Sequence, residues 1–287
     1  MSWLLLDAGN TALKWELTCP AAAQWREADT PEAATAHANR RGSIAMDDPQ
    51  LAAKLLAELE RAGTPTDAAT TAIVGCAVAS EERVDTIDAA IRAASSQKVQ
   101  WLGAAAQFDH DGITLRNSYR NPSQLGPDRW HALIGARARF PQGVLAVINA
   151  GTATTVDGLN EDGHFVGGVI APGIDLMRTS LAQGTARLPL AAGEYVTHPD
   201  NSDDAICTGI LDAQIGLIER RVRRIREQSG ALVQVVLSGG RGPALFALLR
   251  AQAGFGTMIA HEPDLVLRGL WHRARALASD AVTNRVP

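Results

Sequence analysis

The chain has 287 residues, 46% of them hydrophobic, and a formal net charge of −4. This length fits one large domain or two of ordinary size, and the hydrophobic content excludes a low-complexity disordered chain. The slightly negative charge leaves no basic footprint for nucleic acid, and no run of about 18 apolar residues is present to cross a membrane.

The first half of the chain is predicted to open with a strand–turn–strand hairpin. An apolar run at 3–7 is broken by Ala8-Gly9-Asn10 and resumes at 11–17. Strands and helices then alternate. The elements expected before residue 140 are helices at 50–62, 81–94 and 123–139, and strands at 72–78 and 99–102.

The second half opens with the same pattern. A strand at 144–148, a turn at 149–152 and a strand at 153–159 match the first hairpin, almost half the chain later. Two such halves predict a duplicated α/β fold with mixed sheets, in an N-terminal lobe at 1–140 and a C-terminal lobe at 141–287. The later elements expected are strands at 163–170 and 232–237, and helices at 173–183, at 202–228, from 243 and at 263–279.

The two turns carry residues that suit phosphate binding. Gly9 lets backbone N–H groups approach a phosphate, Lys14 can neutralise its charge, and Asp7 can hold Mg²⁺. An ordinary hairpin turn is the alternative for one copy alone. The second copy, with Gly151 and Thr152, favours a pair of turns that clamp a triphosphate from two lobes. The sequence therefore predicts an ATP-dependent phosphotransferase.

The segment at 119–131 carries a second candidate site. Asp128 and Arg129 are adjacent where a helix is expected to open. The carboxylate could accept a hydroxyl proton during phosphoryl transfer, and the guanidinium could bind a substrate carboxylate. The alternative is an acid that favours the helix dipole beside a surface arginine.

Other motifs mainly exclude functions. The segment at 238–242, Ser-Gly-Gly-Arg-Gly, lacks the third glycine of a dinucleotide fingerprint, so it is a nucleoside-contacting loop or a plain strand–helix connection. GxxxxGK[ST], HExxH and GxSxG do not occur, which excludes a P-loop kinase, a zinc protease of that type and a nucleophile elbow. A basic run at 220–226 has no interleaved aromatic residues and indicates a solvated helix face rather than a nucleic-acid surface.

The compartment follows from the cysteines and the first residues. Cys19, Cys76 and Cys207 are far apart and form no CxxC pair, which is typical of free thiols in a reducing cytoplasm. Residues 1–7 have no basic segment and only a short apolar run, so they do not resemble a signal peptide. We expect a cytoplasmic protein without membrane or nucleic-acid partners.

Several segments together resemble the type III pantothenate kinases, within the superfamily of acetate kinases, sugar kinases, Hsp70 and actin. The resemblance covers most of the chain. The segment Tyr-x-Asn-Pro-x-x-Leu-Gly-x-Asp-Arg is specific to the family, whereas the two glycine turns are specific only to the superfamily. The matching segments are Asp-x-Gly-Asn-Thr at 7–11, the family segment at 119–129, Gly-Thr-Ala-x-Thr-x-Asp at 151–157, and stretches at 167–173, 185–189 and 201–209.

This resemblance implies two ribonuclease H-like lobes of the actin-like ATPase fold. It also implies that the chain phosphorylates pantothenate with ATP and Mg²⁺, the first step to coenzyme A, with Asp128 as the general base. The ATP contacts that it implies are Asp7, which also holds Mg²⁺, Ala8, Gly9, Asn10, Thr11, Lys14, Gly151 and Thr152. The pantothenate contacts that it implies are Tyr119, Gly126, Pro127, Arg129 and Ser202.

Two further implications concern the cation and the assembly. The family has Asp, which holds K⁺ or NH₄⁺, where this chain has Asn149, and an amide oxygen brings no charge. The monovalent cation requirement is therefore open. The family forms homodimers, which would explain a long helix at 202–228, although packing within one chain explains it equally. Two other functions stay open: a kinase for another small hydroxy compound, or a non-catalytic regulatory protein of the same fold.

Overall fold

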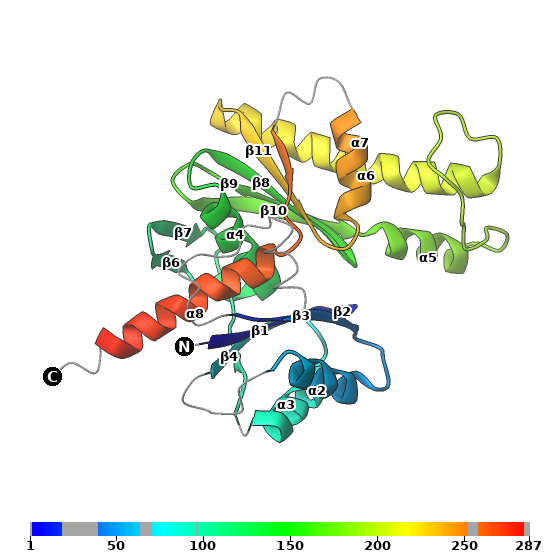
Figure 1. Cartoon of the computed structure of the whole chain (residues 1–287). Coiled ribbons are helices and arrows are strands. Elements are labelled where there is room, and N and C mark those ends of the chain that lie inside the picture. The colour runs from blue at the N-terminus through cyan, green and yellow to red at the C-terminus, as the bar shows by residue number, and fades with distance from the viewer. Residues whose placement is uncertain (1, 19–39, 64–70, 96, 252–257, 284–287) are drawn as a thin grey trace. The chain divides into compact units, whose positions relative to one another are not determined.

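The chain forms two compact units (Figure 1). The computed structural model describes residues 2–18, 40–63, 71–95, 97–251 and 258–283. Unit 1 takes Met1–Gly112, Arg120–Gly135 and Val266–Pro287, and unit 2 takes Ile113–Tyr119 and Ala136–Leu265. The chain thus passes between the units more than once, and the division into lobes at 1–140 and 141–287 stays a prediction.

Unit 1 holds a five-stranded mixed sheet with the order β3-β2-β1-β4-β5. The central strand β1 runs antiparallel to β2 and parallel to β4. Three successive leucines at 4–6 are all fully buried, as expected of a strand that is covered on both faces. The strands are β1 (Ser2–Ala8), β2 (Ala12–Leu17), β3 (Arg41–Ala45), β4 (Thr71–Ala77) and β5 (Gln100–Trp101).

Helices α2 (Leu51–Arg61) and α3 (Glu81–Ser95) pack on this sheet. In α2, buried leucines recur every four residues, which gives the helix one apolar face. The core contains the fully buried Trp15, whose Nε1 donates to Glu58 Oε2 at 2.6 Å. The hydrogen bond satisfies the indole N–H and lets a large aromatic ring fill the core.

The second sheet has seven strands in the order β12-β11-β8-β9-β10-β7-β6. β8 forms an antiparallel hairpin with β9 and runs parallel to β11 on its other side. The sheet is therefore mixed, like the first. Its strands are β6 (Gln107–His110), β7 (Ile113–Asn117), β8 (Val144–Ala150), β9 (Ala153–Leu159), β10 (His164–Pro172), β11 (Val233–Ser238) and β12 (Ile259–His261).

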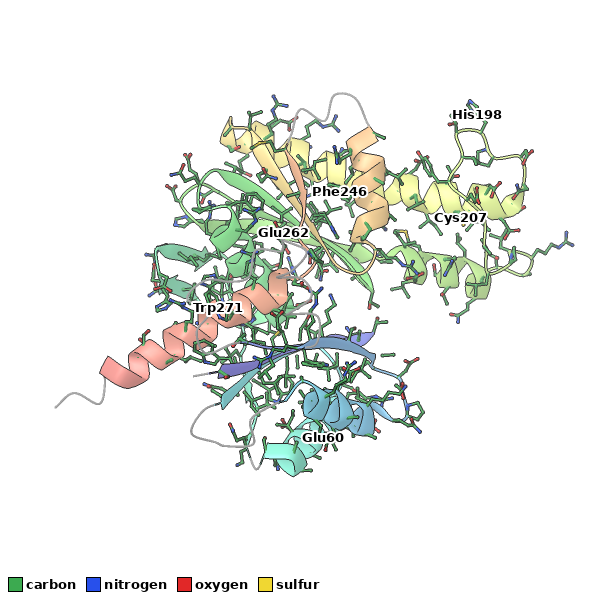
Figure 2. All side chains as sticks on the ribbon, in the orientation of Figure 1. Glu60, His198, Cys207, Phe246, Glu262 and Trp271 are labelled. Carbon is green, nitrogen blue, oxygen red and sulfur yellow. The ribbon has the colours of Figure 1, made fainter. Side chains whose placement is uncertain are left out.

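Helices α5 (Ile174–Gly184), α6 (Ser202–Ser229) and α7 (Gly242–Ala251) belong to unit 2. Apolar residues of α6 and α7 share one core with β8 and β11, and Phe246 of α7 packs against it (Figure 2). The ends of α6 are encoded locally. Asn201 caps the start by accepting the Asp204 N–H at 3.0 Å, and Gly230 ends the helix at φ 68°.

The segment that carries Asp128 differs from its prediction in one respect. The helix expected at 123–139 is divided into a 3₁₀ turn η1 (Pro122–Gln124) and α4 (Pro127–Arg139). Pro127 has no N–H to donate and is favoured at the first helical position, so the α-helix begins there. Asp128 consequently lies in the first turn of α4.

The prediction of a mixed α/β fold with two sheets is confirmed, with both hairpins at their expected places. Strands β3, β6, β7 and β12 were not predicted; they are short and, apart from β7, bury at most one residue each. The closing helix α8 (Leu265–Thr283) begins and ends a few residues later than the range expected at 263–279. Among the described residues, no helix combines the length and apolar character needed to span a bilayer.

Candidate active site

The first predicted phosphate turn, residues 9–11, joins β1 to β2 in unit 1. The Gly9 N–H donates to Ala12 O at 3.1 Å, which closes the turn. Asp7 pairs with Lys14 across the ladder, so a carboxylate and an ammonium group flank the turn. Ala8 is buried at the end of β1, whereas Asn10 and Thr11 are exposed at the tip. The turn therefore exposes polar side chains at its tip, while the end of the strand before it is buried. This arrangement suits a phosphate ligand.

Asp7 has an unusual electrostatic environment. Burial raises the pKa of its carboxyl from 3.8 to about 6, against the charge of Lys14, which lowers it. The carboxyl of Asp128 raises this pKa further, and the Cys76 thiol, 3.9 Å from Asp7 Oδ1, lowers it slightly. Unit 1 thus brings together two acids that sequence analysis assigned to different motifs.

Asp128 lies in the first turn of α4, behind Pro127. Burial raises the pKa of its carboxyl, while the backbone N–H and charge of Arg129 lower it in part. A Cβ atom on Gly126 would lie 2.6 Å from Asp128 Oδ1, so glycine leaves room for the carboxylate. Arg129 itself is only 5% exposed, so its guanidinium is a buried charge rather than a surface group.

His131 contacts the segment that carries Asp128 and was not among the predicted site residues. Its ring is fully buried, its Nδ1 lies 2.6 Å from Pro127 O, and burial lowers its pKa to about 3. The ring is therefore neutral, and Nδ1 donates to the carbonyl at the start of the helix. A Cβ atom on Gly269 of α8 would lie 1.9 Å from His131 O, so α8 packs directly on this helix. Both contacts fix the turn that carries Asp128; a lone histidine among apolar residues gave no sequence signal.

The second predicted phosphate turn, residues 151–152, joins β8 to β9 in unit 2, and it is one residue shorter than the first. The Gly151 N–H donates to Ala153 O at 3.1 Å, two residues along the chain. Asn149 pairs with Thr155 across the ladder, at the position where Asp7 pairs with Lys14 in the first turn. The repeat seen in the sequence thus becomes two hairpins of similar form but unequal charge.

Two other segments of unit 2 pack on this second turn. The Gly173 N–H donates to Thr152 O at 2.9 Å, and a Cβ atom on Gly173 would lie 2.2 Å from Gly151 O. Gly239, at φ +91°, would place a Cβ atom 2.4 Å from Ala150 O. Glycine is required at both positions, because the backbone of each segment approaches the turn itself.

The remaining predicted substrate residues lie in unit 2. The Tyr119 ring is tilted against Phe165 with centroids 5.2 Å apart. Ser202 is the first residue of α6 and is exposed at the edge of an apolar cavity of about 490 Å³ between α5 and α6. Of the predicted site residues, unit 1 holds 7–14 and 126–129. Unit 2 holds the second turn, Tyr119 and Ser202.

The two mixed sheets, each with a glycine turn between antiparallel strands, define the class of protein by its fold, the actin-like ATPase fold. A similar solved structure is the activator of the 2-hydroxyisocaproyl-CoA dehydratase from Clostridium difficile with bound ADPNP. It is 11% identical, with a TM-score of 0.54, and the match covers 100% of this chain and 99% of that one. At this identity the likeness supports the fold alone.

The family is shown by sequence. A family model described as type III pantothenate kinase matches residues 3–224, so the chain belongs to the type III pantothenate kinase family. Type III pantothenate kinases of Laribacter hongkongensis and Aromatoleum aromaticum are 41% and 42% identical to it. These matches cover 95% and 93% of this chain and 98% and 95% of the relatives. The predicted kinase class and family are confirmed.

Proposed function

We propose that the chain transfers the γ-phosphoryl group of ATP to pantothenate, giving 4'-phosphopantothenate for coenzyme A biosynthesis, with Asp128 as the general base. Membership of the type III pantothenate kinase family supports the reaction. The observation that supports the base is the position of Asp128, partly buried in the first turn of α4, with a pKa that desolvation raises. A raised pKa makes the carboxylate a stronger proton acceptor, provided that it is ionised.

In this reaction the pantothenate hydroxyl oxygen forms a bond to the γ-phosphorus, the bond to the ADP oxygen breaks, and the proton passes to Asp128. Lys14 and the N–H groups of the first turn stabilise the phosphate charge, with Gly151 and Thr152 of the second turn as the further ATP contacts. Mg²⁺, when bound with ATP, neutralises charge on the phosphate oxygens. Asp7 fits this role because Mg²⁺ needs only one or two protein carboxylates beside phosphates and water.

The pantothenate contacts are Tyr119, Gly126, Pro127, Arg129 and Ser202. The buried charge of Arg129 supports a role next to the base, because it lowers the pKa of Asp128 and so keeps part of that carboxyl ionised. Gly126 gives Asp128 its space. The exposed hydroxyl of Ser202 is available to a ligand at the start of α6.

We also propose a monovalent cation, K⁺ or NH₄⁺, beside Asn149. The Thr155 hydroxyl is buried and has no hydrogen-bond partner among the described residues, and it belongs to the residue paired with Asn149 across the ladder. Directly opposed residues put their side chains on the same face of a sheet. An amide oxygen and a hydroxyl oxygen fit a monovalent ion, although without the charge that an aspartate would add.

A homodimer through α5 and α6 completes the proposal, with a second copy of the chain as the occupant of the apolar cavity. Leu176 on α5 is 46% exposed, which supports a partner surface there. Leu176→Asp should give monomers in light scattering. The control is Leu232→Asp, since Leu232 is 66% exposed outside these helices. Monomers of the unsubstituted chain would exclude the dimer.

A cytoplasmic location stays a prediction.

The base assignment is tested with Asp128→Asn. Turnover should fall at least 100-fold, in the range that general-base catalysis supplies, while ATP binding persists. Asp85→Asn is the control, because Asp85 is exposed on α3. Unchanged turnover in Asp128→Asn would exclude the assignment. The acceptor is tested by measuring the turnover of the unsubstituted chain with pantothenate and with a panel of other small hydroxy compounds. Higher turnover with another compound would indicate a kinase of that acceptor. No turnover with any of them would favour a regulatory protein.

A further inference from the structure

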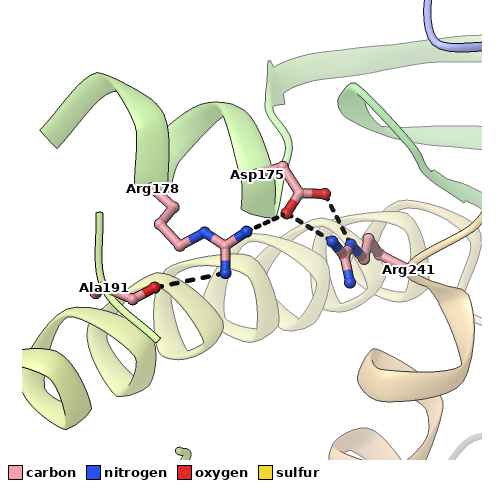
Figure 3. A network of polar contacts seen from close by, with 4 residues as sticks. All are labelled: Asp175, Arg178, Ala191 and Arg241. Atoms are coloured by element: carbon pink, nitrogen blue, oxygen red, sulfur yellow. Dashed lines mark hydrogen bonds and ion pairs between the residues drawn. The ribbon is translucent and has the colours of Figure 1, made fainter. Parts of the chain in front are cut away.

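An ion-pair cluster lies beside the second phosphate turn, and no role has yet been assigned to it (Figure 3). Arg241 Nε donates to Asp175 Oδ2 at 2.8 Å, and Arg241 Nη2 donates to Asp175 Oδ1 at 2.6 Å. Arg178 Nη2 also donates to Asp175 Oδ1, at 3.1 Å, and its Nη1 lies 3.5 Å from Ala191 O. Two guanidinium groups thus face one carboxylate, and the cluster has a net positive charge.

Both sides of the cluster are fixed to the turn by backbone contacts. The Arg241 N–H donates to Ala150 O at 2.9 Å, and Gly239, two residues earlier in the chain, packs on the same carbonyl. Asp175 follows Gly173, whose N–H donates to Thr152 O at 2.9 Å. Arg241 and Asp175 are therefore held near the ends of the same short turn, although they lie 66 residues apart in sequence.

Stability explains the ion pair poorly. The Arg241 and Asp175 side chains are 48% and 46% exposed, and ion pairs at such exposure contribute about 0–1 kcal/mol. The pair instead orients Arg241, because two parallel hydrogen bonds to one carboxylate fix the plane of the guanidinium. Asp175 uses two of the five N–H donors of Arg241, and the others make no hydrogen bond within the described part of the chain.

The place of Arg241 in the sheet indicates an anionic ligand. It lies between the end of β11 and α7, and β11 runs parallel to β8, with Ser238 opposite Asn149. Ligands of open α/β sheets bind outside the carboxyl ends of such strands. A half-exposed guanidinium with open donors, beside a turn that suits phosphate, matches the geometry and charge of a phosphate group.

We propose that Arg241 binds a phosphate group of the nucleotide and that Asp175 is its positioning residue. This inference rests on the proposed function, since it takes the second turn as part of the ATP site. It is specific to the phosphates, so it predicts no contribution to the affinity for adenosine.

The test is equilibrium binding of Mg²⁺-ATP, Mg²⁺-ADP and adenosine, by calorimetry without pantothenate. Arg241→Ala should weaken ATP and ADP binding about tenfold, as expected for one half-exposed charged hydrogen-bonding group, and leave adenosine unchanged. Arg241→Lys, which keeps the charge but not the fork, should lose about threefold. Arg224→Ala, an arginine of α6 with 59% exposure, should change none of them. ATP affinity retained in Arg241→Ala, or an equal loss for adenosine, would overturn the proposal.

The positioning role has its own test. Asp175→Asn should weaken ATP binding about threefold when Arg241 is present and have no effect in the Arg241→Ala background. An equal effect in both backgrounds would refute the role of Asp175. Because no acceptor is present, these measurements do not depend on pantothenate. A chain that binds nucleotide through Arg241 but phosphorylates another acceptor would refute the proposed function and leave this inference standing.

Discussion

Asp7→Asn should make the chain more stable at neutral pH while it removes the proposed Mg²⁺ ligand. The pKa of this carboxyl is raised from 3.8 to about 6, mainly by burial. A pKa raised from 3.8 to about 6 corresponds to about 3 kcal/mol of stability lost when the group is ionised. Asp7 is only partly buried by its surface area, so solvent reduces this figure, and we expect about 1–2 kcal/mol.

The sign follows from proton binding. The folded chain holds the Asp7 proton more tightly than the unfolded chain does, so this group favours folding at low pH and the advantage is lost as pH rises from 3.8 to about 6. The asparagine variant undergoes no such loss. The difference in unfolding free energy between the two chains should therefore be small near pH 4 and reach its full value above pH 6.

Urea unfolding at several pH values, followed by tryptophan fluorescence, measures this difference. Every tryptophan of the sequence falls within the residue ranges of unit 1, so the signal reports the unit that contains Asp7. Asp85→Asn, on the exposed side of α3, is the matched control and should show no pH-dependent gain. If Asp7→Asn were less stable than the unsubstituted chain at pH 8, or its gain did not depend on pH, the electrostatic account of Asp7 would be wrong.

Three further predictions follow from the site. The kcat/KM of the reaction should fall below about pH 6, because Asp7 has a pKa near that value and loses its charge there. The raised pKa of Asp128 acts in the same direction. A flat pH–rate profile would contradict this prediction. Gly173→Ala should raise the KM for ATP and lower the unfolding free energy by about 1–3 kcal/mol, because its Cβ atom would lie 2.2 Å from the carbonyl of Gly151 in the second turn. The control is Gly216→Ala in α6, whose Cβ atom would meet no atom within 4 Å. This control should raise the unfolding free energy by up to about 1 kcal/mol. Asn149→Asp should lower the K⁺ concentration needed for half-maximal activity against a choline control, and an unchanged K⁺ dependence would remove the cation from this position.

The hairpins could be predicted because their information is local. Gly9 and Gly151 interrupt apolar runs at strand spacing, and the antiparallel ladders follow directly. The ends of α6 are equally local, with an asparagine cap and a glycine stop. β3 was missed because its five residues bury one side chain, and the strand exists only through its pairing with β2.

The site was predictable in its motifs but not in its contacts. Asp128 was identified from the segment around it, whereas its interaction with Asp7 depends on how β1 and α4 pack in unit 1. His131 and Gly269 meet because α8 returns to unit 1 at the end of the chain, and no short-range pattern predicts such a contact. The pair Asp175–Arg241 likewise joins distant segments, and each residue alone reads as a surface charge.

The central claim is that this chain phosphorylates pantothenate with ATP, using Asp128 as the base. The most direct measurement couples ADP release to a spectroscopic readout, with pantothenate, Mg²⁺-ATP and K⁺ or NH₄⁺, and identifies the product by mass spectrometry. The account predicts one ADP per monophosphorylated pantothenate, and almost none with Asp128→Asn. No pantothenate-dependent ADP release by the unsubstituted chain, or full turnover by Asp128→Asn, would contradict it.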